Sequence, residues 1–261
     1  MVGLEWAPLA GALVGLIVAL TGVGGGALMA PILLFGFGFD LLTVVATDLL
    51  FATITKLVSS GAHSKNNRVD WEVARRMWVG SIPATLIVML LTWLGYTATV
   101  TGSVTRLLGA LILLSGLALL FGGQIQKYRK GKRIQAPQQF KKYQPAMTSA
   151  SGFFLGTLVS LTSIGAGAIG AILLRGLYPL RMVPKRLVAT DTIHAVPVSL
   201  LGGLGYLMMG HTNIELLTML LVGSIPAALF GCKLMGMISP DWIKHALSVA
   251  LIASSVKLLG F

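Results

Sequence analysis

Asp48 and Asp191 are acidic residues inside long apolar stretches, and their depth makes them candidates for chemistry. Counted at helical rise from Asp40, Asp48 lies about 12 Å into an apolar layer of roughly 30 Å. Asp191 lies about 8 Å in from the opposite edge, counted from Arg186. A charge at that depth is costly and must meet a partner or water. Each residue is therefore predicted to couple protons or, alternatively, to tie helices together as a hydrogen-bonded aspartate.

His194 follows Asp191 by one helical turn, on the same face, whereas the matching position after Asp48 is Phe51. A histidine beside an aspartate inside a membrane can carry protons or, when charged, help to hold an anion. The alternative is a core histidine that donates to the aspartate. Lys56 is predicted to extend its amine to the nearer membrane edge, with an anion contact as the alternative.

Two glycine-rich stretches interrupt the apolar sequence, Thr21-Gly22-Val23-Gly24-Gly25-Gly26 and Thr162-Ser163-Ile164-Gly165-Ala166-Gly167. Inside hydrocarbon a helix break is tolerated only where protein or a wet cavity satisfies the freed backbone groups. Where a helix restarts, its first N–H groups are unpaired and its dipole is positive, so an anion can bind there. Close helix packing through small residues is the alternative explanation.

These features together predict a small-anion site where the two breaks meet, with neighbouring hydroxyl groups and possible proton coupling through Asp48 and Asp191. The single cysteine, Cys232, excludes a multi-cysteine metal centre, and no catalytic set, metal set or cofactor is predicted. The predicted substrate-binding residues are Thr21, Gly22, Gly24, Gly25, Thr47, Thr162, Ser163, Gly165, Gly167, Thr190, His194 and Ser224.

The composition indicates which elements must position these residues. The chain has 261 residues, of which 55% are hydrophobic and 11% charged, and its mean hydropathy is +0.85. This is too little polar surface for a soluble globule, so we predict an all-α polytopic membrane protein. The apolar runs predict ten helical segments, some of them broken or re-entrant, at about 4–21, 24–39, 41–61, 74–95, 101–122, 147–162, 165–178, 187–209, 214–235 and 242–260.

The two halves of the chain carry the same motifs in the same order. The first break in the first half corresponds to the second break in the second half. The tripeptide Ala46-Thr47-Asp48 corresponds to Ala189-Thr190-Asp191, at nearly the same distance along the chain from its break. The pentapeptide Gly-Ser-Ile-Pro-Ala begins at Gly80 and again at Gly223. Because each half has an odd number of segments, five, the second half enters the membrane from the opposite side, which predicts an inverted repeat. We expect one transmembrane domain over 1–261, with repeats at 1–123 and 146–261 and a basic connector at 124–145.

The basic residues predict the orientation. With both termini outside the cytoplasm, all but Lys56, Arg106 and Lys257 of the 20 lysines and arginines fall at cytoplasmic ends, as the positive-inside rule requires. The net charge of +12 is not gathered on one face of a soluble domain, so nucleic-acid binding is not expected. The basic connector is read as a cytoplasmic segment near anionic lipid.

The combination of Thr21-Gly22-Val23-Gly24-Gly25-Gly26 with Pro31, Ala46-Thr47-Asp48, the basic connector and the paired Gly-Ser-Ile-Pro-Ala boxes resembles the TauE/SafE sulfite exporter family, also called the four-toluene-sulfonate uptake permease family. The resemblance covers nearly the whole chain. It implies a bacterial inner-membrane carrier of a small organosulfur or sulfur oxyanion, such as sulfite, sulfoacetate or a related sulfonate. The second break has fewer glycines than the first, so the two half-sites need not contribute equally.

The expected function is therefore secondary transport or facilitated export of such an anion. A proton-coupled uptake permease, and a metal-cation carrier using Asp48, Asp191 and His194, are the alternatives. No catalytic triad, paired-acid motif or zinc spacing indicates an enzyme. The expected partners are a small anionic substrate and membrane lipid, and a homodimer is left open.

Overall fold

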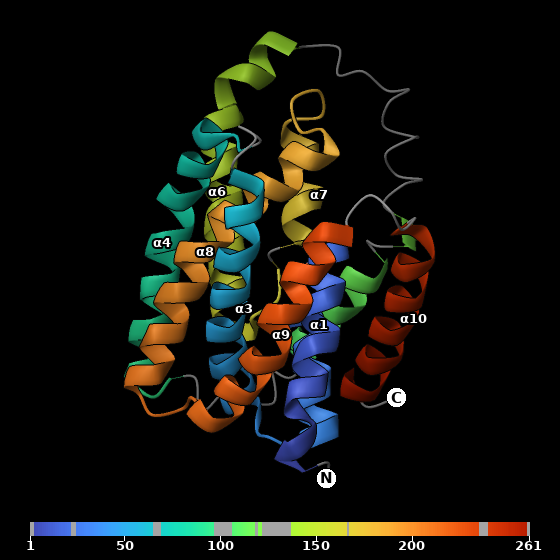
Figure 1. The fold of residues 1–261 in the computed structure, drawn as a ribbon. Coiled ribbons are helices and arrows are strands. Elements are labelled where there is room, and N and C mark those ends of the chain that lie inside the picture. Colours follow the sequence, from blue (N-terminus) through green and yellow to red (C-terminus); the bar gives the residue numbers. More distant parts are fainter. Residues whose placement is uncertain are drawn as a thin grey trace.

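The computed structural model describes residues 3–21, 25–64, 69–96, 106–117, 120–121, 137–165, 167–234 and 240–259. All regular secondary structure within these ranges is helical, which confirms the predicted all-α fold (Figure 1). Residues Arg106–Leu117 form an apolar helix. The labelled elements are η1 (Leu4–Trp6), α1 (Ala7–Thr21), α2 (Gly26–Pro31), the π-helical η2 (Ile32–Phe37), α3 (Leu41–Ser64), α4 (Trp71–Trp93), α6 (Pro137–Thr162), α7 (Ala168–Leu177), α8 (Pro184–Met208), α9 (Ile214–Leu234) and α10 (Pro240–Leu259).

Each predicted segment corresponds to a helix, and the largest difference is at the start of α6. That helix begins at Pro137 rather than near residue 147, so the last part of the predicted connector is helical. The extra turns are rich in glutamine and lysine, which are good helix formers. They were not predicted because apolar runs do not reveal a polar extension of a helix. Residues 122–136 of the connector lie outside the described residues.

Helix length separates full membrane spans from half-spans. Among the described residues, four helices contain stretches long and apolar enough to cross a membrane, namely Leu41–Val58, Trp71–Trp93, Arg186–Met208 and Ile214–Gly231. In contrast, α7 has 10 residues and so a length of about 15 Å, half of a hydrocarbon core. Its end returns to the start of α6, where the Gln144 side-chain amide donates to the Leu177 carbonyl. The pair α6–α7 therefore brings the chain back to the end from which it came.

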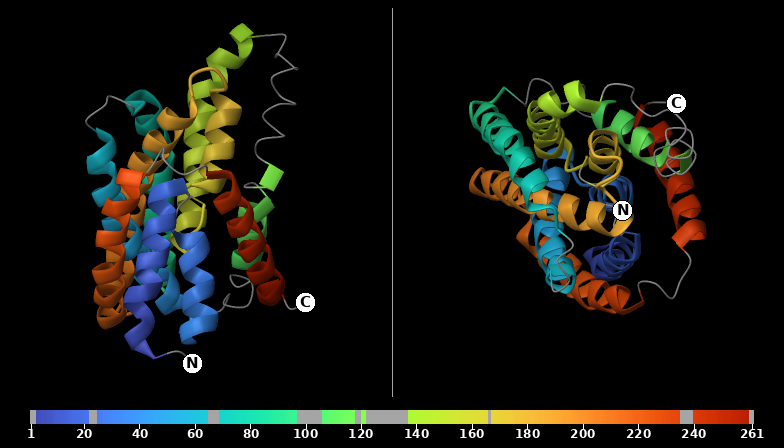
Figure 2. Two further views of the ribbon diagram at one scale, coloured as in Figure 1. Left: turned by 45° about the vertical axis from the view of Figure 1, so that its right-hand side comes forward. Right: turned by 90° about the horizontal axis from the view of Figure 1, so that it is seen from above.

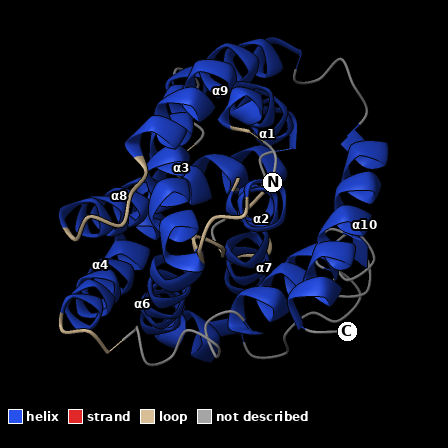
Figure 3. Ribbon diagram, turned by 90° about the horizontal axis from the view of Figure 1, so that it is seen from below, coloured by secondary structure: helices blue, strands red, loops and turns tan. Residues whose placement is uncertain are grey.

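The main helix pairs join the two halves of the chain. Helix α1 packs on α9, α4 packs on α6, and α3 packs on α8, while α3 also contacts α9 and α4 also contacts α8. Exchanging the first five segments for the last five converts α1–α9 into α6–α4, converts α3–α9 into α8–α4, and leaves α3–α8 unchanged. Figure 3 shows α3 surrounded by helices of both halves. Residues on α3 are therefore placed at the centre of the molecule.

Glycine allows two of these helix pairs to approach closely. Gly11 and Gly15 of α1 face α9, where an added Cβ at either position would collide with the backbone. The corresponding residues of the second half, Gly152 and Gly156 of α6, make the same kind of contact with the backbone of α4. Small residues at membrane helix crossings permit such backbone contacts. The Gly-Ser-Ile-Pro-Ala boxes lie at these crossings, so their glycines serve packing.

Both chain ends lie at one end of the bundle. Helix α1 begins and α10 ends there, while the start of α6 and the connection between α7 and α8 lie at the other end (Figures 1 and 2). Arg76, Arg181 and Arg186 gather at that second end. This arrangement brings predicted cytoplasmic basic residues from separate parts of the sequence to the same side.

Candidate functional site

Four ionisable side chains are buried between α3 and α8. Asp48 and Lys56 come from α3, Asp191 and His194 come from α8, and each is less than one-tenth exposed. The two helices are packed antiparallel, because the start of α8 bonds near the end of α3 and the start of α3 bonds near the end of α8. Each aspartate lies two helical turns into its helix, hence about 10 Å from opposite ends. The structure therefore gathers the charges that the sequence placed at depth.

The second break interrupts the chain beside this cluster. Helix α6 ends at Thr162, and Ser163 adopts a left-handed conformation with φ of 58°. The Thr162 hydroxyl donates to the Leu158 carbonyl at 2.7 Å and accepts from the Ile164 N–H at 3.2 Å. The Thr162 hydroxyl, which was predicted to bind substrate, thus stabilises the backbone conformation of the break. Gly165 and Gly167 have φ of 133° and 108°, which a residue with a side chain rarely adopts.

The first break is described only in part. Thr21 is the last residue of α1, and Gly22 and Gly24 lie outside the described residues, as does the side chain of Thr21. The chain is described again from Gly25, whose carbonyl accepts from the Met29 N–H at 2.8 Å and starts α2.

The two breaks meet at Asp48. Gly26 lies so close to the Ser163 carbonyl that an added Cβ would collide with it, and that Cβ would lie 2.9 Å from Asp48 Oδ2. The Ser163 hydroxyl lies close to the Asp48 carboxylate without hydrogen-bond geometry. On the other side of the cluster, Asp191 accepts from the backbone N–H of Gly167 at the start of α7. Each break therefore has one buried aspartate beside it.

The site is marked by buried polar atoms without partners. A buried polar group that forms no hydrogen bond costs about 1–3 kcal/mol, and folded proteins contain few of them. Their concentration beside the two breaks indicates a position prepared for a ligand or ordered water. Among the described residues, the unpartnered atoms here are both carboxylate oxygens of Asp48, Asp191 Oδ1, His194 Nδ1 and Ser163 Oγ. Ser224 Oγ is also unpartnered, and Ser224 packs against Gly15 of α1, ahead of the first break.

The hydroxyls of Thr47 and Thr190, both predicted to line the site, bond to the chain ahead of neighbouring helices. The Thr47 hydroxyl accepts from the N–H of Asn213, which precedes α9, at 3.3 Å. The Thr190 hydroxyl accepts from the N–H of Asp70, which precedes α4, at 2.9 Å. Both hydroxyls are buried and tie a core helix to the start of a neighbouring one, at opposite ends of the molecule. The two bonds correspond to each other in the repeat, since the alignment that matches Thr47 with Thr190 also matches Asp70 with Asn213.

His194 and Ser81 form a contact that the sequence did not reveal. His194 Nε2 and Ser81 Oγ are 3.0 Å apart, and the His194 carbonyl accepts from Trp78 Nε1 at 3.1 Å. In the other half Ser224 corresponds to Ser81, but Phe51 replaces the histidine, and Ser224 stays unpartnered among the described residues. The asymmetry predicted from Phe51 and His194 therefore extends to the two proline boxes.

Lys56 differs from its predicted position at the membrane edge. Only 8% of the residue is exposed, and its charge interacts with Asp191, Asp48 and His194. It lies about 22 Å along α3 from the start of that helix. Because Thr53 bonds to Ser199 of the antiparallel α8, the Lys56 backbone lies opposite the turn of α8 between His194 and Ser199. The number of residues between the start of this segment and Lys56 was the signal in the sequence that could have predicted its depth in the bundle.

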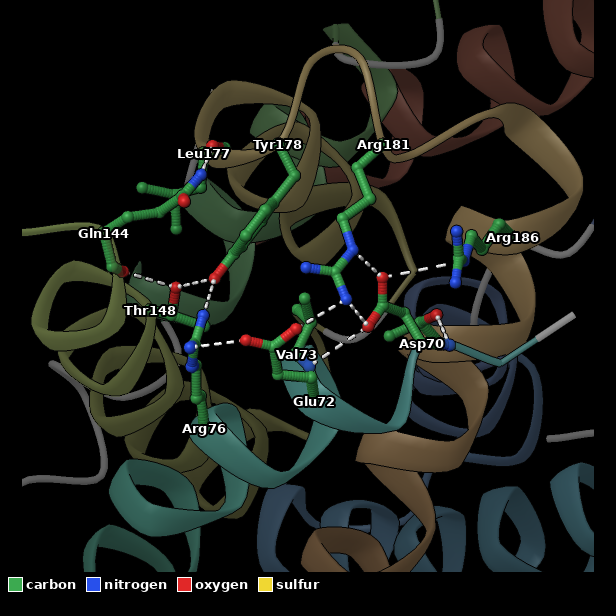
Figure 4. Close-up of polar contacts among 11 residues, drawn as sticks. Asp70, Glu72, Val73, Arg76, Gln144, Thr148, Leu177, Tyr178, Arg181 and Arg186 are labelled. Atoms are coloured by element: carbon green, nitrogen blue, oxygen red, sulfur yellow. Dashed lines mark hydrogen bonds and ion pairs between the residues drawn. The ribbon is translucent and has the colours of Figure 1, made fainter. Parts of the chain in front are cut away.

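A cluster of ion pairs closes the end of the molecule near Asp191 (Figure 4). Arg181, between α7 and α8, donates from Nη2 to Asp70 Oδ1 at 2.8 Å and to Glu72 Oε2 at 2.7 Å. Arg76 pairs with Glu72 at 2.6 Å and donates to the Tyr178 hydroxyl at 3.3 Å. The cluster ties the start of α4 to the end of α7. At the opposite end Asn213 caps α9 through Leu216 N–H at 2.9 Å, and no ion pair joins the described residues there.

The family of the chain follows from its sequence over nearly its whole length. Residues 7–258 match the family described as Sulfite exporter TauE/SafE. The chain belongs to the TauE/SafE sulfite exporter family. The resemblance recognised in its motifs is thereby confirmed, and a membrane transporter is the class that the family and its members indicate.

Three relatives match this TauE/SafE chain over most of its length. The chain is 29% identical to the probable membrane transporter protein YjnA of Bacillus subtilis, covering 96% of this chain and 98% of that protein. It is 28% identical to the probable membrane transporter protein YunE of the same organism, covering 86% and 84%. It is 25% identical to the probable membrane transporter protein MJ0441 of Methanocaldococcus jannaschii, covering 92% and 90%. No solved structure matches the chain.

Proposed function

We propose that this TauE/SafE transporter carries a small sulfur oxyanion, such as sulfite, sulfoacetate or a related sulfonate, across the bacterial inner membrane. The anion would bind where the two breaks meet. The observation that carries the proposal is the group of buried, unpartnered polar atoms at and near the two breaks. It includes the hydroxyl of Ser163 in the second break and the hydroxyl of Ser224, which packs against α1 ahead of the first break. A hydroxyl donates readily to an oxyanion, and these two have no donor role among the described residues.

The start of α7 adds backbone donors to this site. Its first N–H groups follow Gly167, and a helix start carries a positive partial charge that favours an anion. The Asp191 carboxylate accepts from the backbone N–H of Gly167. A substrate oxyanion would make the same kind of contact, so the position is chemically suited to a negatively charged oxygen group.

The two halves of the transporter are proposed to form an inverted repeat around the site. Three features support it: the interchange of the helix pairs, the corresponding glycine crossings of α1 and α6, and the corresponding bonds at Thr47 and Thr190. The end that carries the ion-pair cluster is proposed to face the cytoplasm, since positive charge is enriched on that side of membrane proteins. Both termini would then lie outside.

Export is the direction favoured for an anion that moves alone. The cytoplasm is electrically negative, so moving one negative charge outward gains about 2.3 kcal/mol per 100 mV. A facilitated path would suffice for that direction, whereas uptake would require a coupled ion.

The test uses purified protein in liposomes loaded with sulfoacetate or methanesulfonate. Efflux should exceed that from protein-free liposomes, and an imposed inside-negative potential or a pH gradient should change its rate. An efflux rate equal to that of empty liposomes for every anion tested would contradict the proposed function.

A metal-cation carrier is less well supported. Over the part of the chain that the structure describes, no three histidine, cysteine, aspartate or glutamate side chains lie close enough together to hold a metal ion. Competition by divalent metals, with a requirement for Asp48, would favour that alternative.

A further inference from the structure

Lys56 is a buried cation between two buried carboxylates. Along α3 it lies about two turns beyond Asp48, and the bond between Thr53 and Ser199 places its backbone about one and a half turns from the level of Asp191 on α8. All three residues are less than one-tenth exposed, and the charge of Lys56 acts on both carboxylates. A buried charge is costly unless a charge of the opposite sign compensates it, and the Lys56 ammonium is a positive charge that acts on both carboxylates. The repeat does not require this arrangement, because the position corresponding to Lys56 in the second half is Ser199, which donates to the Ala195 carbonyl.

A substrate anion cannot enter this group of charges without a compensating change. With both aspartates ionised, the two carboxylates and the ammonium already carry one negative charge in excess. Another anion would add to that excess inside a region from which water is largely excluded, where unpaired charge is expensive. Proton uptake by a carboxylate offsets the charge of the incoming anion, so that the net charge of the group stays at minus one.

Asp191 is the carboxylate placed to make this exchange. Lys56 faces it from α3, the backbone of Gly167 from the start of α7, and His194 lies one turn further along its own helix. Its second oxygen has no partner among the described residues. The other titratable group of the cluster, Asp48, lies nearer the opposite end of α3, beside Ser163. The imidazole of His194 is held by Ser81 of α4 through Nε2, leaving Nδ1 unpartnered in the described structure.

We propose that Lys56 is the cation that pairs with the transported anion, and that Asp191 takes up one proton when the anion replaces it beside Lys56. The proton and the anion then cross together. This inference rests on the proposed function and names the ion that is coupled to it. For a monoanion the coupled step moves no net charge, so the pH gradient rather than the membrane potential becomes its driving force. With a cytoplasm more alkaline than the outside, coupling would drive uptake instead of the export favoured for an anion that moves alone.

The experiment uses liposomes containing the full-length protein and a pH-sensitive dye. Methanesulfonate is the probe, because its acid is too strong to carry a proton itself near neutral pH. In the wild-type protein an anion gradient should drive protons in the same direction as the anion, at about one proton per anion, and an imposed pH gradient should concentrate the anion. The Asp191→Asn protein should still bind methanesulfonate but should move no protons with it.

Lys56 is tested by binding. The Lys56→Met protein should bind methanesulfonate about tenfold or more weakly than wild type, as expected for the loss of a charge-assisted contact, and Lys56→Arg should restore binding. The control is Lys257→Met, which removes an exposed lysine of α10 that lies 4.4 Å from the centre of the Phe35 ring and should leave binding unchanged.

The inference is overturned if the wild-type protein moves methanesulfonate without protons. It is also overturned if the Lys56→Met protein binds methanesulfonate as tightly as both the wild-type and the Lys257→Met proteins do. The first result needs no variant and so does not depend on whether a variant folds. Failure of the wild-type protein to bind or move any sulfonate or sulfite is a different result, since it contradicts the proposed function and removes the inference with it.

Discussion

Thr162 illustrates at the scale of one residue how far the sequence leads. Residue type and depth singled out Thr162, Ser163, Asp48, Asp191 and His194. The structure places the first four at or beside the breaks, and His194 contacts Ser81 of α4. The sequence did not show that the Thr162 hydroxyl is already used within the break. It also did not show which partners Lys56, Thr47 and Thr190 have, because an apolar pattern gives the depth of a side chain but not its neighbours across the bundle.

Replacing Thr162 with valine should loosen the second break. The change removes the donor to Leu158 and the acceptor for Ile164 N–H, both of them buried, so stability should fall by about 1–3 kcal/mol. Anion binding should weaken as well, because Ser163 follows directly. Thr157→Val in the same helix is the matched control, since it removes an exposed bond of the same type to Phe153. Thermal unfolding in detergent and methanesulfonate binding measure both effects, and equal behaviour of the two variants would contradict this role.

At the scale of the elements, the half-length helix α7 and the long α6 could not be read from apolar runs. The run at 165–178 predicted a segment, but only the structure shows that the helix within it has 10 residues. The polar first turns of α6 were assigned to a connector because hydropathy does not distinguish a polar helix from a loop. The ion-pair cluster was also missed, since Asp70 and Arg181 are far apart in sequence and meet only through the packing of α4 against α6 and α8.

The Asp70→Asn variant places an asparagine at the start of α4, as Asn213 stands at the start of α9. It should keep a cap for Val73 N–H but lose the ion pairs with Arg181 and Arg186. Because both arginines are more than one-third exposed, the loss should be about 1 kcal/mol and should shrink as salt is added. Thermal unfolding at low and high salt measures it, with Glu215→Gln at the opposite end as the control. An unfolding temperature for Asp70→Asn that matches wild type at low salt would show that the cluster does not hold this end together.

At the scale of the whole molecule, the repeated motifs predicted which helices correspond, and the positions of the basic residues predicted which end they share. The structure agrees in the pairing of its helices and in the gathering of arginines at the end opposite the termini. The repeat alone did not predict the contents of the centre, because the charge of Lys56 and the contact between His194 and Ser81 have no equivalents in the other half. The departures from the repeat are concentrated at the candidate site.

The proposed orientation predicts which residues a membrane-impermeant maleimide can reach. In a Cys232→Ser background, Glu5→Cys at the start of the chain should be labelled in intact cells. Lys142→Cys, exposed near the start of α6, should be labelled only after the cells are opened. The reverse pattern would mean that the termini face the cytoplasm, and labelling of both positions in intact cells would contradict their placement on opposite sides.

The most direct test of the central claim, a sulfur-oxyanion site at the two breaks, is ligand-induced thermal stabilisation of the purified protein. A bound ligand at a hundredfold excess over its Kd stabilises the folded state by about 2.7 kcal/mol. We predict that sulfite, sulfoacetate or methanesulfonate raises the unfolding temperature, that Ser224→Ala reduces the shift, and that carboxylates and divalent metals give smaller shifts. Stabilisation by a divalent metal that requires Asp48, with no response to any sulfur oxyanion, would contradict the account.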